Sequence, residues 1–310
     1  MSIDPEIVGA AAFIGLIVGF TGLGGGALLT PVLVIVFGIQ PLAAVSSDLV
    51  ASLAMKPVGA AVHVRRGQVR YDIVKWLALG SVPTAFAGVF VLKAIGGQHV
   101  QHRIKIGIGI ALLLGVAGLV VRPLLDRRAE RATGDGVVPP YRTVLVGLFA
   151  GLLVGMTSVG AGSIVMVLLL LVHPKLRPIE LVGTDLLQAV PLVGAASLGH
   201  IVAGNFKLSL TASLILGAVP AVYVGARLSV RFSGPSLRPV LMVVLMLSAL
   251  ALLGVPNAVL IAIFAAALLV AAVALTRFGL ERRHTNADLA TLAPSAVVPP
   301  APDPDVRNPA

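Results

Sequence analysis

One largely apolar run, residues 43–64, carries Asp48, Ser52, Lys56 and His63. Their spacings of 4, 4 and 7 place them along one face of a helix, because side chains four residues apart lie one above the other. An ammonium group inside an apolar run attracts an anion, whereas a carboxylate or an imidazole can carry a proton. We therefore expect this stripe to line the path of a charged species, with Lys56 meeting an anion.

Simpler roles stay open for each ionisable residue. Lys56 could pair with Asp48 across two turns, or extend toward the membrane surface. Asp48 and its counterpart Asp185 follow a hydroxyl residue near the start of an apolar run, so they could cap a helix instead of coupling transport to an ion. His63 and His200 could anchor helix ends rather than gate or shuttle protons.

Two glycine-rich stretches interrupt the apolar sequence, GFTGLGGGALLTPV at 19–32 and GMTSVGAGSIVMVL at 155–168. Glycine permits positive φ and close approach of another group, and amides at the start of a helix attract anions. Hydroxyl groups add further donors. The expected substrate-binding groups of these two glycine motifs are Thr21, Gly24, Gly25, Gly26, Ala27, Thr157, Ser158, Gly160, Gly162 and Ser163.

The apolar segments beside the first motif, about 7–20 and 27–38, are short. At ~1.5 Å per residue each reaches only ~20 Å, against a hydrocarbon core of ~30 Å. We therefore predict a pair of half-helices that meet inside the membrane, with the same arrangement inverted at the second motif. The alternative is a glycine-mediated helix crossing with a packing role alone.

A nucleotide-binding interpretation of the first motif fails. GLGGGA at 22–27 fits a dinucleotide fingerprint, and Asp48 follows about 20 residues later. No alternating strand pattern precedes the motif, however, and the second copy has Val165 where a small residue is required.

The two motifs begin the halves of a duplicated sequence, about 6–121 and 142–253. The motifs align at an offset of 136, and at an offset of 137 Ser47-Asp48-Leu49 aligns with Thr184-Asp185-Leu186. Matches of Asp, His and Pro in register exceed what a glycine-rich composition supplies. The halves differ in the stripe, because Val193 stands opposite Lys56 and Gln188 is added one turn from Asp185.

Composition indicates an integral membrane protein. The 310 residues are 57% hydrophobic and 12% charged with a mean hydropathy of +1.02, whereas soluble domains carry about 25% charged residues. The chain has no cysteine, which excludes disulfides and thiolate chemistry. The apolar runs hold two Asp and two His, too few for an intramembrane metal site, so we expect neither an enzyme nor a cofactor.

Loop charges predict the topology. If loops alternate sides with the N-terminus outside, the inside loops hold 18 Lys and Arg, the outside loops hold 4, and Lys56 lies within a span. Basic residues mark the cytoplasmic side. The net charge of +10 is then a topological signal and not a nucleic-acid surface, and the two halves have opposite orientations, as in many secondary transporters.

The predicted fold is therefore an all-α polytopic membrane protein with two inverted repeats. Each repeat has a glycine-broken half-helix hairpin and about three spanning helices, and one extra helix follows. The expected segments are 1–121 as first repeat, 122–141 as a basic cytoplasmic linker, 142–253 as second repeat, 254–277 as final transmembrane helix, and 278–310 as a disordered Pro/Ala-rich cytoplasmic tail.

The duplicated glycine motif and layout resemble the sulfite exporter TauE/SafE family of bacterial membrane proteins over roughly residues 6–276. The resemblance implies export of sulfite, small organosulfonates or related anions across the inner membrane. A passive anion channel or an uptake permease remains an alternative. The expected partners are a small anion, the lipid bilayer and a second copy of the chain in a homodimer.

Overall fold

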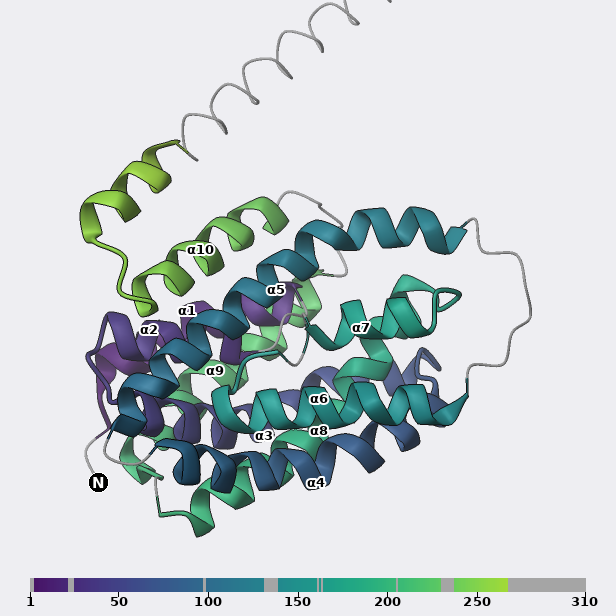
Figure 1. Cartoon of the computed structure of the whole chain (residues 1–310), viewed down its shortest axis with the longest axis horizontal. Helices are drawn as coiled ribbons and strands as arrows, with labels where there is room; N and C mark the ends of the chain where they lie inside the picture. Colours follow the sequence, from purple (N-terminus) through teal and green to yellow (C-terminus); the bar gives the residue numbers. More distant parts are fainter. Residues whose placement is uncertain are drawn as a thin grey trace, which may run out of the picture. The chain divides into compact units, whose positions relative to one another are not determined.

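The computed structural model describes residues 3–21, 25–96, 99–130, 139–160, 162, 164–204, 206–229 and 237–266, and within them every regular element is a helix (Figure 1). The chain divides into two compact units, residues 1–260 and 261–310, and the second is described only to residue 266. Outside the described residues lie Gly24, Ser163, residues 131–138 of the linker, residues 267–277 of the predicted final helix and the predicted tail.

The order of helices repeats along the chain: a long helix, a break, a short helix, then three more helices. The first series is α1 (Pro5–Thr21), η1 (Gly25–Ala27), α2 (Leu29–Ile35), α3 (Pro41–Arg65), α4 (Tyr71–Gly96) and α5 (Val100–Glu130). The second series is α6 (Pro140–Thr157), α7 (Ile164–Val172), α8 (Pro178–Val202), α9 (Leu208–Ser229) and α10 (Leu237–Leu252). A further short helix covers Asn257–Ala266.

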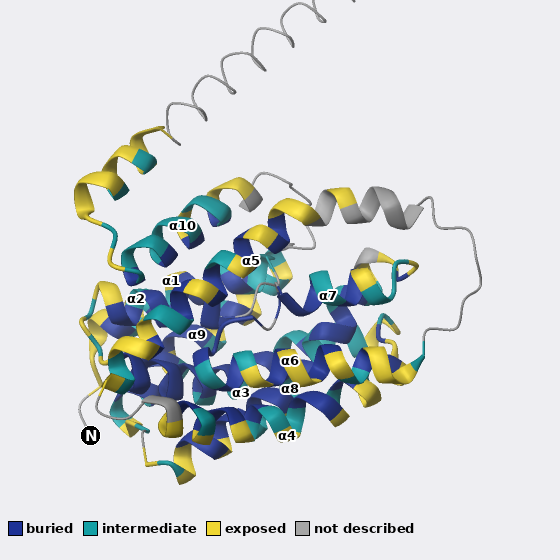
Figure 2. Ribbon diagram, viewed as in Figure 1, coloured by how far each residue is buried: buried dark blue, intermediate teal, exposed yellow. Residues whose placement is uncertain are grey.

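Within the described residues, six helices are long and apolar enough to cross a membrane: Pro41–Arg65, Tyr71–Ala94, Val100–Val121, Pro140–Thr157, Ile179–Val202 and Leu208–Leu228. Large apolar side chains on these helices are exposed, among them Leu79 (60%), Leu145 (57%) and Leu198 (56%). Exposed positions recur along several helices, where the ribbon is yellow (Figure 2). Such exposed apolar side chains suit lipid as the solvent. The prediction of an all-helical, multi-pass membrane protein is therefore confirmed.

The two arms of each glycine break differ in length. Helices α1 and α6 have 17 and 18 residues, whereas α2 and α7 have 7 and 9. At about 1.5 Å per residue the first arms reach ~25 Å and the second arms only ~10–14 Å. Each break therefore follows a nearly full-length helix rather than a half-helix, because α1 begins at Pro5 and α6 at Pro140, earlier than the apolar run alone suggests. The segment predicted as a linker from residue 122 also begins as a helix, because α5 continues to Glu130.

Backbone contact through glycine joins α1 to α9. A Cβ atom on Gly15 would lie 2.7 Å from the carbonyl oxygen of Ala218, and one on Gly19 would lie 2.2 Å from that of Val222. Residue numbers rise together on both helices, so α1 and α9 run parallel. Only glycine permits so close an approach of two helices.

A second contact of the same kind joins α6 to α4. A Cβ atom on Gly151 would lie 2.2 Å from the carbonyl oxygen of Ser81, and one on Gly155 would lie 2.3 Å from that of Ala85. Each of these residues is the sequence equivalent of one in the α1/α9 contact, at an offset of 136 or 137. We call the two contacts the glycine seams. Each seam joins a helix of one repeat to a helix of the other.

Between the seams, the equivalent helices α3 and α8 pack directly against each other. Leu53 of α3 lies near Gly194 of α8, and Gly59 of α3 lies near Leu186 of α8. Residue numbers rise on one helix while they fall on the other, so α3 and α8 run antiparallel.

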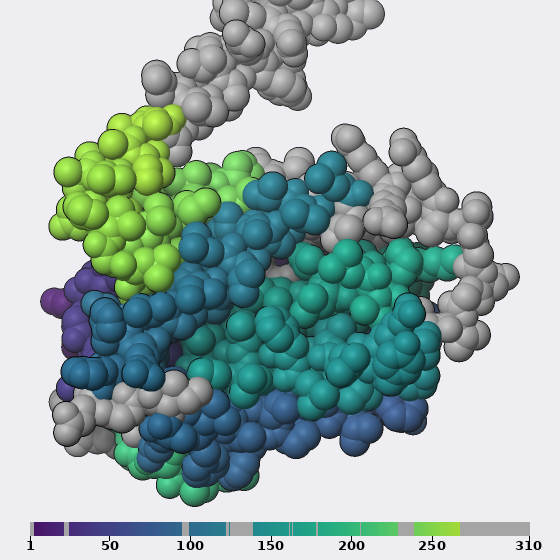
Figure 3. All heavy atoms as spheres, viewed as in Figure 1, coloured from purple at the N-terminus to yellow at the C-terminus, as the bar shows by residue number. Residues whose placement is uncertain are grey.

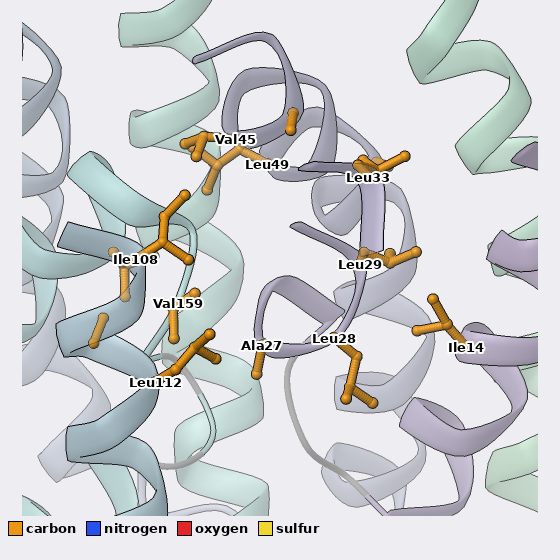
Figure 4. Close-up of a cluster of buried hydrophobic side chains, with 14 of the residues drawn as sticks. Ile14, Ala27, Leu28, Leu29, Leu33, Val45, Leu49, Ile108, Leu112 and Val159 are labelled. Atoms are coloured by element: carbon orange, nitrogen blue, oxygen red, sulfur yellow. The ribbon is translucent and has the colours of Figure 1, made fainter. Parts of the chain in front are cut away.

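Each short helix packs into a separate apolar cluster. Helix α2 contributes Leu29 and Leu33 to the larger cluster, which also includes Leu49 of α3 and Leu112 of α5 (Figure 4). Helix α7 contributes Leu169 and neighbours to the smaller cluster with α4, α6 and α8. Helices α5 and α10 contact each other and lie together on the face shown in Figure 3. The described residues next to the two breaks, 25–27 and 158–160, are all buried.

The loops gather at two ends. At one end, the Arg70 amide donates to Thr184 Oγ1 at 3.1 Å and Thr143 is hydrogen-bonded to His173 at 2.8 Å. These contacts bring together loop 66–70, loop 173–177 and the starts of α4, α6 and α8, which we call the basic end. At the opposite end, Lys93 Nζ donates to the Ala203 carbonyl.

Candidate functional site

The two glycine motifs meet inside the protein. A Cβ atom on Gly26 would lie 1.9 Å from the carbonyl oxygen of Ser158 and 2.7 Å from its hydroxyl oxygen. The described motif residues on both sides of this contact are buried: Gly25, Gly26, Ala27, Ser158, Gly160 and Gly162. Glycine at position 26 is required because any side chain would push the motifs apart.

One carboxylate joins the two motifs. The hydroxyl groups of Thr30 and Ser158 both donate to Oδ2 of Asp48, at 2.7 and 2.8 Å. The Ser52 hydroxyl lies 3.5 Å from Oδ1, at the outer limit of a hydrogen bond. Asp48 has no exposed surface. A single buried group therefore connects α2, α3 and the chain that follows α6.

The structure overturns the capping role considered for the two aspartates. Helix α3 begins at Pro41 with Gln40 as its N-cap, so Asp48 lies two turns inside the helix. Asp185 lies equally deep in α8, where Arg177 is the N-cap. The helices begin at prolines that precede the Ser-Asp and Thr-Asp pairs, because proline fits the first helical position.

Ser158 has an unusual backbone conformation. Its φ of 60° is positive, and it alone among the described non-glycine residues has this sign. Gly160 and Gly162 follow with φ of 118° and 106°. The left-handed residue ends α6, and a non-glycine residue holds that conformation only where its surroundings compensate the cost. The hydrogen bond to Asp48 is such a compensation.

Lys56 lies in the interior with two carboxylates nearby. Its side chain is 8% exposed, and Asp185 and Asp48 are the charges that act on it electrostatically. Neither a hydrogen bond nor an ion pair within 4 Å joins its Nζ to the residues that the structure describes. Burial rules out the alternative in which Lys56 extends to the membrane surface, and the absent contact argues against a tight pair with Asp48.

The position of Lys56 explains its lack of a counterpart. It lies midway along α3 between Leu53 and Gly59, the residues that contact α8, and its equivalent Val193 is buried on α8 beside Gly194. Two lysines at equivalent places on these crossing helices would repel each other in a medium of low dielectric. One lysine and one valine avoid that cost.

Gln188 presents a donor without a protein partner. Its Oε1 accepts from the Ser81 hydroxyl at 3.3 Å, while its buried Nε2 has no hydrogen-bond partner in the part of the chain that the structure describes. Buried amide groups are almost always paired. The free donor therefore marks a place where another polar group would be favourable.

Two of the expected hydroxyl donors are engaged elsewhere. Thr21 and Thr157 donate to the carbonyl oxygens of Ile17 and Leu153, one turn earlier in their own helices, both at 2.7 Å. Threonine within a helix often forms this local bond. The hydroxyls of Thr30 and Ser158 instead donate to Asp48, where the two motifs meet. Thr30 was not selected from the sequence, although it is a hydroxyl residue in an apolar run directly after the break.

The two histidines do not join the central group. His200 is fully buried and donates from Nε2 to the Gly155 carbonyl at 2.9 Å, whereas His63 is half-buried and bonded through Nδ1 to Gln68 at 3.0 Å. Each lies near the end of its helix, His63 at the basic end. Both therefore tie α3 and α8 to neighbouring segments.

Comparisons with known proteins agree with this architecture. The model of the family described as sulfite exporter TauE/SafE matches residues 7–252. The probable membrane transporter protein YjnA of Bacillus subtilis (strain 168) is 36% identical over 259 residues, which cover 82% of this chain and all of YjnA. The probable membrane transporter protein YdhB of the same organism is 24% identical over 69% of this chain and 85% of its own length. No solved structure matches significantly.

Since the family model covers most of the chain and both glycine motifs, and YjnA aligns over its whole length, the protein belongs to the sulfite exporter TauE/SafE family of membrane proteins.

Proposed function

We propose that this protein is a secondary transporter that exports small anions, sulfite or organosulfonates, across the inner membrane. The family description names a sulfite exporter, and two relatives are named as probable membrane transporters rather than enzymes. The observation that carries the proposal is Lys56, a buried ammonium group with no hydrogen-bond or ion-pair partner among the described residues, on the same helix as the carboxylate that joins both motifs. Intramembrane charges of this kind mark substrate paths.

The anion binds between Lys56 and the meeting point of the glycine motifs. Lys56 supplies the charge, the hydroxyls of Thr30 and Ser158 supply directed hydrogen bonds, and Gly26 permits the close approach of the two motifs. The start of α2 contributes less than a long helix would, because the helix has only seven residues and the helix dipole grows from aligned peptide units. This donor set recognises oxygens and negative charge, so it suits sulfite and sulfonates alike.

The repeats are inverted in this proposal, with the N-terminus outside and the C-terminus in the cytoplasm. Support comes from the antiparallel equivalents α3 and α8, as an axis in the membrane plane requires. Loops 66–70 and 173–177, both rich in basic residues, share the basic end, which becomes the cytoplasmic side. Reporter fusions after Arg66 and at Gly204 should report opposite sides. The same side for both would refute inversion.

Flux measurements test the transport function. Full-length protein in proteoliposomes should move labelled sulfite or methanesulfonate faster than acetate, and Lys56→Met should remove most of this flux. Lys75→Met is the matched control, because Lys75 is exposed at the basic end. Flux that persists unchanged after the ion gradients collapse would identify a passive channel instead, and normal flux in Lys56→Met would refute the site.

Transport direction needs a separate measurement. Right-side-out and inverted vesicles from the same cells should differ, with accumulation in the inverted vesicles when the protein works as an exporter. Accumulation in right-side-out vesicles would instead indicate an uptake permease.

A further inference from the structure

We propose that the Asp48 carboxylate acts as an internal competitor of the transported anion: without substrate it occupies the hydroxyl groups that receive the anion, and it leaves them when it takes up a proton. This inference rests on the proposed function and names its coupling ion. It assigns one proton to each anion that binds.

The hydrogen bonds of Asp48 are those an oxyanion would make. Both short bonds end on one oxygen, Oδ2, and come from Thr30 beyond the first break and Ser158 at the second. Two hydroxyls from different repeats thus converge on a single negatively charged oxygen. A sulfonate or sulfite oxygen has the same charge and the same capacity to accept. The carboxylate and the anion therefore compete for one pair of donors.

The charges of the site favour proton uptake. Lys56 carries the positive charge, and Asp48 and Asp185 are the carboxylates that act on it. With both carboxylates ionised the group has one net negative charge, so a bound monoanion would raise it to two around a single ammonium. Unbalanced buried charge is costly. A proton taken from water onto Asp48 removes one negative charge. The neutral carboxyl group is also a weaker hydrogen-bond acceptor for the hydroxyls of Thr30 and Ser158.

Among the charged groups around Asp48, Lys56 of the same helix acts on it electrostatically. From the sequence, η1, α2 and residues 158–160 contain no titratable side chain, and those of α9, Tyr223 and Arg227, are exposed. Helix α8 contributes Asp185, which acts through Lys56. The charged residues at the start of α5 are exposed: His102, Arg103 and Lys105. An anion bound at Thr30 and Ser158 therefore changes the proton affinity of Asp48 more directly than that of any of these other groups.

The second repeat lacks the same competitor. At an offset of 136, the residues equivalent to Thr30 and Ser158 are Met166 and Gly22, neither of which has a hydroxyl group. The pair of hydroxyl donors that binds Asp48 is therefore not repeated at the equivalent positions of the second repeat. The asymmetry predicts one competing carboxylate and hence one proton.

Binding of methanesulfonate at different pH values tests the inference. Methanesulfonate stays fully ionised near neutral pH, so only the protein titrates. In purified full-length protein, the Kd of methanesulfonate should rise about tenfold per pH unit once the pH exceeds the range in which Asp48 loses its proton. Asp48→Asn should bind with a Kd that is independent of pH and lower than the wild-type value at about pH 8 to 9. Asp72→Asn, which removes an exposed carboxylate, should follow the wild type.

A second readout does not depend on the variant folding. A pH indicator in weakly buffered solution should detect uptake of about one proton per methanesulfonate bound by the wild type. Ser158→Ala should weaken binding yet keep this uptake. Binding by the wild type that needs Lys56 but is independent of pH and takes up no proton would overturn the inference and leave the proposed function intact. If neither the wild type nor Asp48→Asn binds methanesulfonate or sulfite, the proposed function fails, and the inference fails with it.

Discussion

The glycine seams and the α3/α8 centre differ in how far the two repeats carry equivalent residues at equivalent positions. At the seams, Gly19 on Val222 and Gly155 on Ala85 are equivalent contacts of nearly equal closeness. At the centre, the second repeat has Val193 at the position equivalent to Lys56. Packing has kept its symmetry, whereas the polar chemistry has lost it.

The difference follows from what each region must do. Helices that touch through their backbones tolerate no added atom, so equivalent seams keep equivalent small residues. A site near the crossing of two equivalent helices receives both copies of each side chain, and two buried like charges would repel. A site for one anion therefore requires that one copy change.

The largest effect is expected at the seams. Gly19→Val or Gly155→Val should abolish insertion of folded protein, because the new side chain would overlap the facing carbonyl oxygen and overpacking a helix contact is strongly destabilising. Gly9→Ala is the control, since nothing lies within 4 Å of its Cβ position. Yield of monodisperse protein after detergent extraction measures the effect. Normal yield from one seam variant alone would show that the seams are not equivalent.

The second prediction concerns the asymmetric lysine. Lys56→Met should weaken anion binding by roughly 10- to 100-fold, because a hydrogen bond to a charged group contributes about 1.5–3 kcal/mol. Adding Val193→Lys to this variant moves the ammonium to the other repeat and should restore part of the affinity if the two positions face one cavity. Titration calorimetry measures both steps. A double variant no better than Lys56→Met would place Val193 outside the site.

Gln188 allows a smaller test on the α8 side. Gln188→Leu should leave the thermal unfolding midpoint unchanged or raise it, because the cost of the buried Nε2, which has no partner among the described residues, offsets the long hydrogen bond from Ser81 that is lost. Anion affinity should fall by about five- to tenfold, the value of about one neutral hydrogen bond. Lower stability with unchanged affinity would show that the amide serves the fold through Ser81 alone.

The smallest effect is expected at the basic end. Burial lowers the pKa of His173 below its usual 6.5, so the folded protein favours the neutral imidazole. The contribution of His173 to the free energy of unfolding is therefore fully present above about pH 6.5 and is lost as the pH falls below that value. His173→Gln should reduce this decline in unfolding midpoints measured at about pH 5 and 8. An identical decline in the variant would assign it to other groups.

Much of the outcome was readable from the sequence. The apolar runs predicted the helices, since a membrane span needs length and few charges. The offset matches predicted the duplication, and the spacing of Asp48, Ser52 and Lys56 predicted a shared face. These features depend on local periodicity, which a linear sequence displays directly.

Tertiary structure alone decided which groups meet. Ser158 and Asp48 are 110 residues apart, and no spacing rule connects an aspartate in one repeat to a serine in the other. Thr21 and Thr157 looked like donors, but their hydroxyls are bonded within their own helices. The lengths of the helices beside each break could not be predicted from the sequence, because a helix end depends on the neighbouring segments that bury it. The sequence determined the helices, the duplication and the polar stripe, whereas packing between the repeats selected the carboxylate and hydroxyls that form the centre.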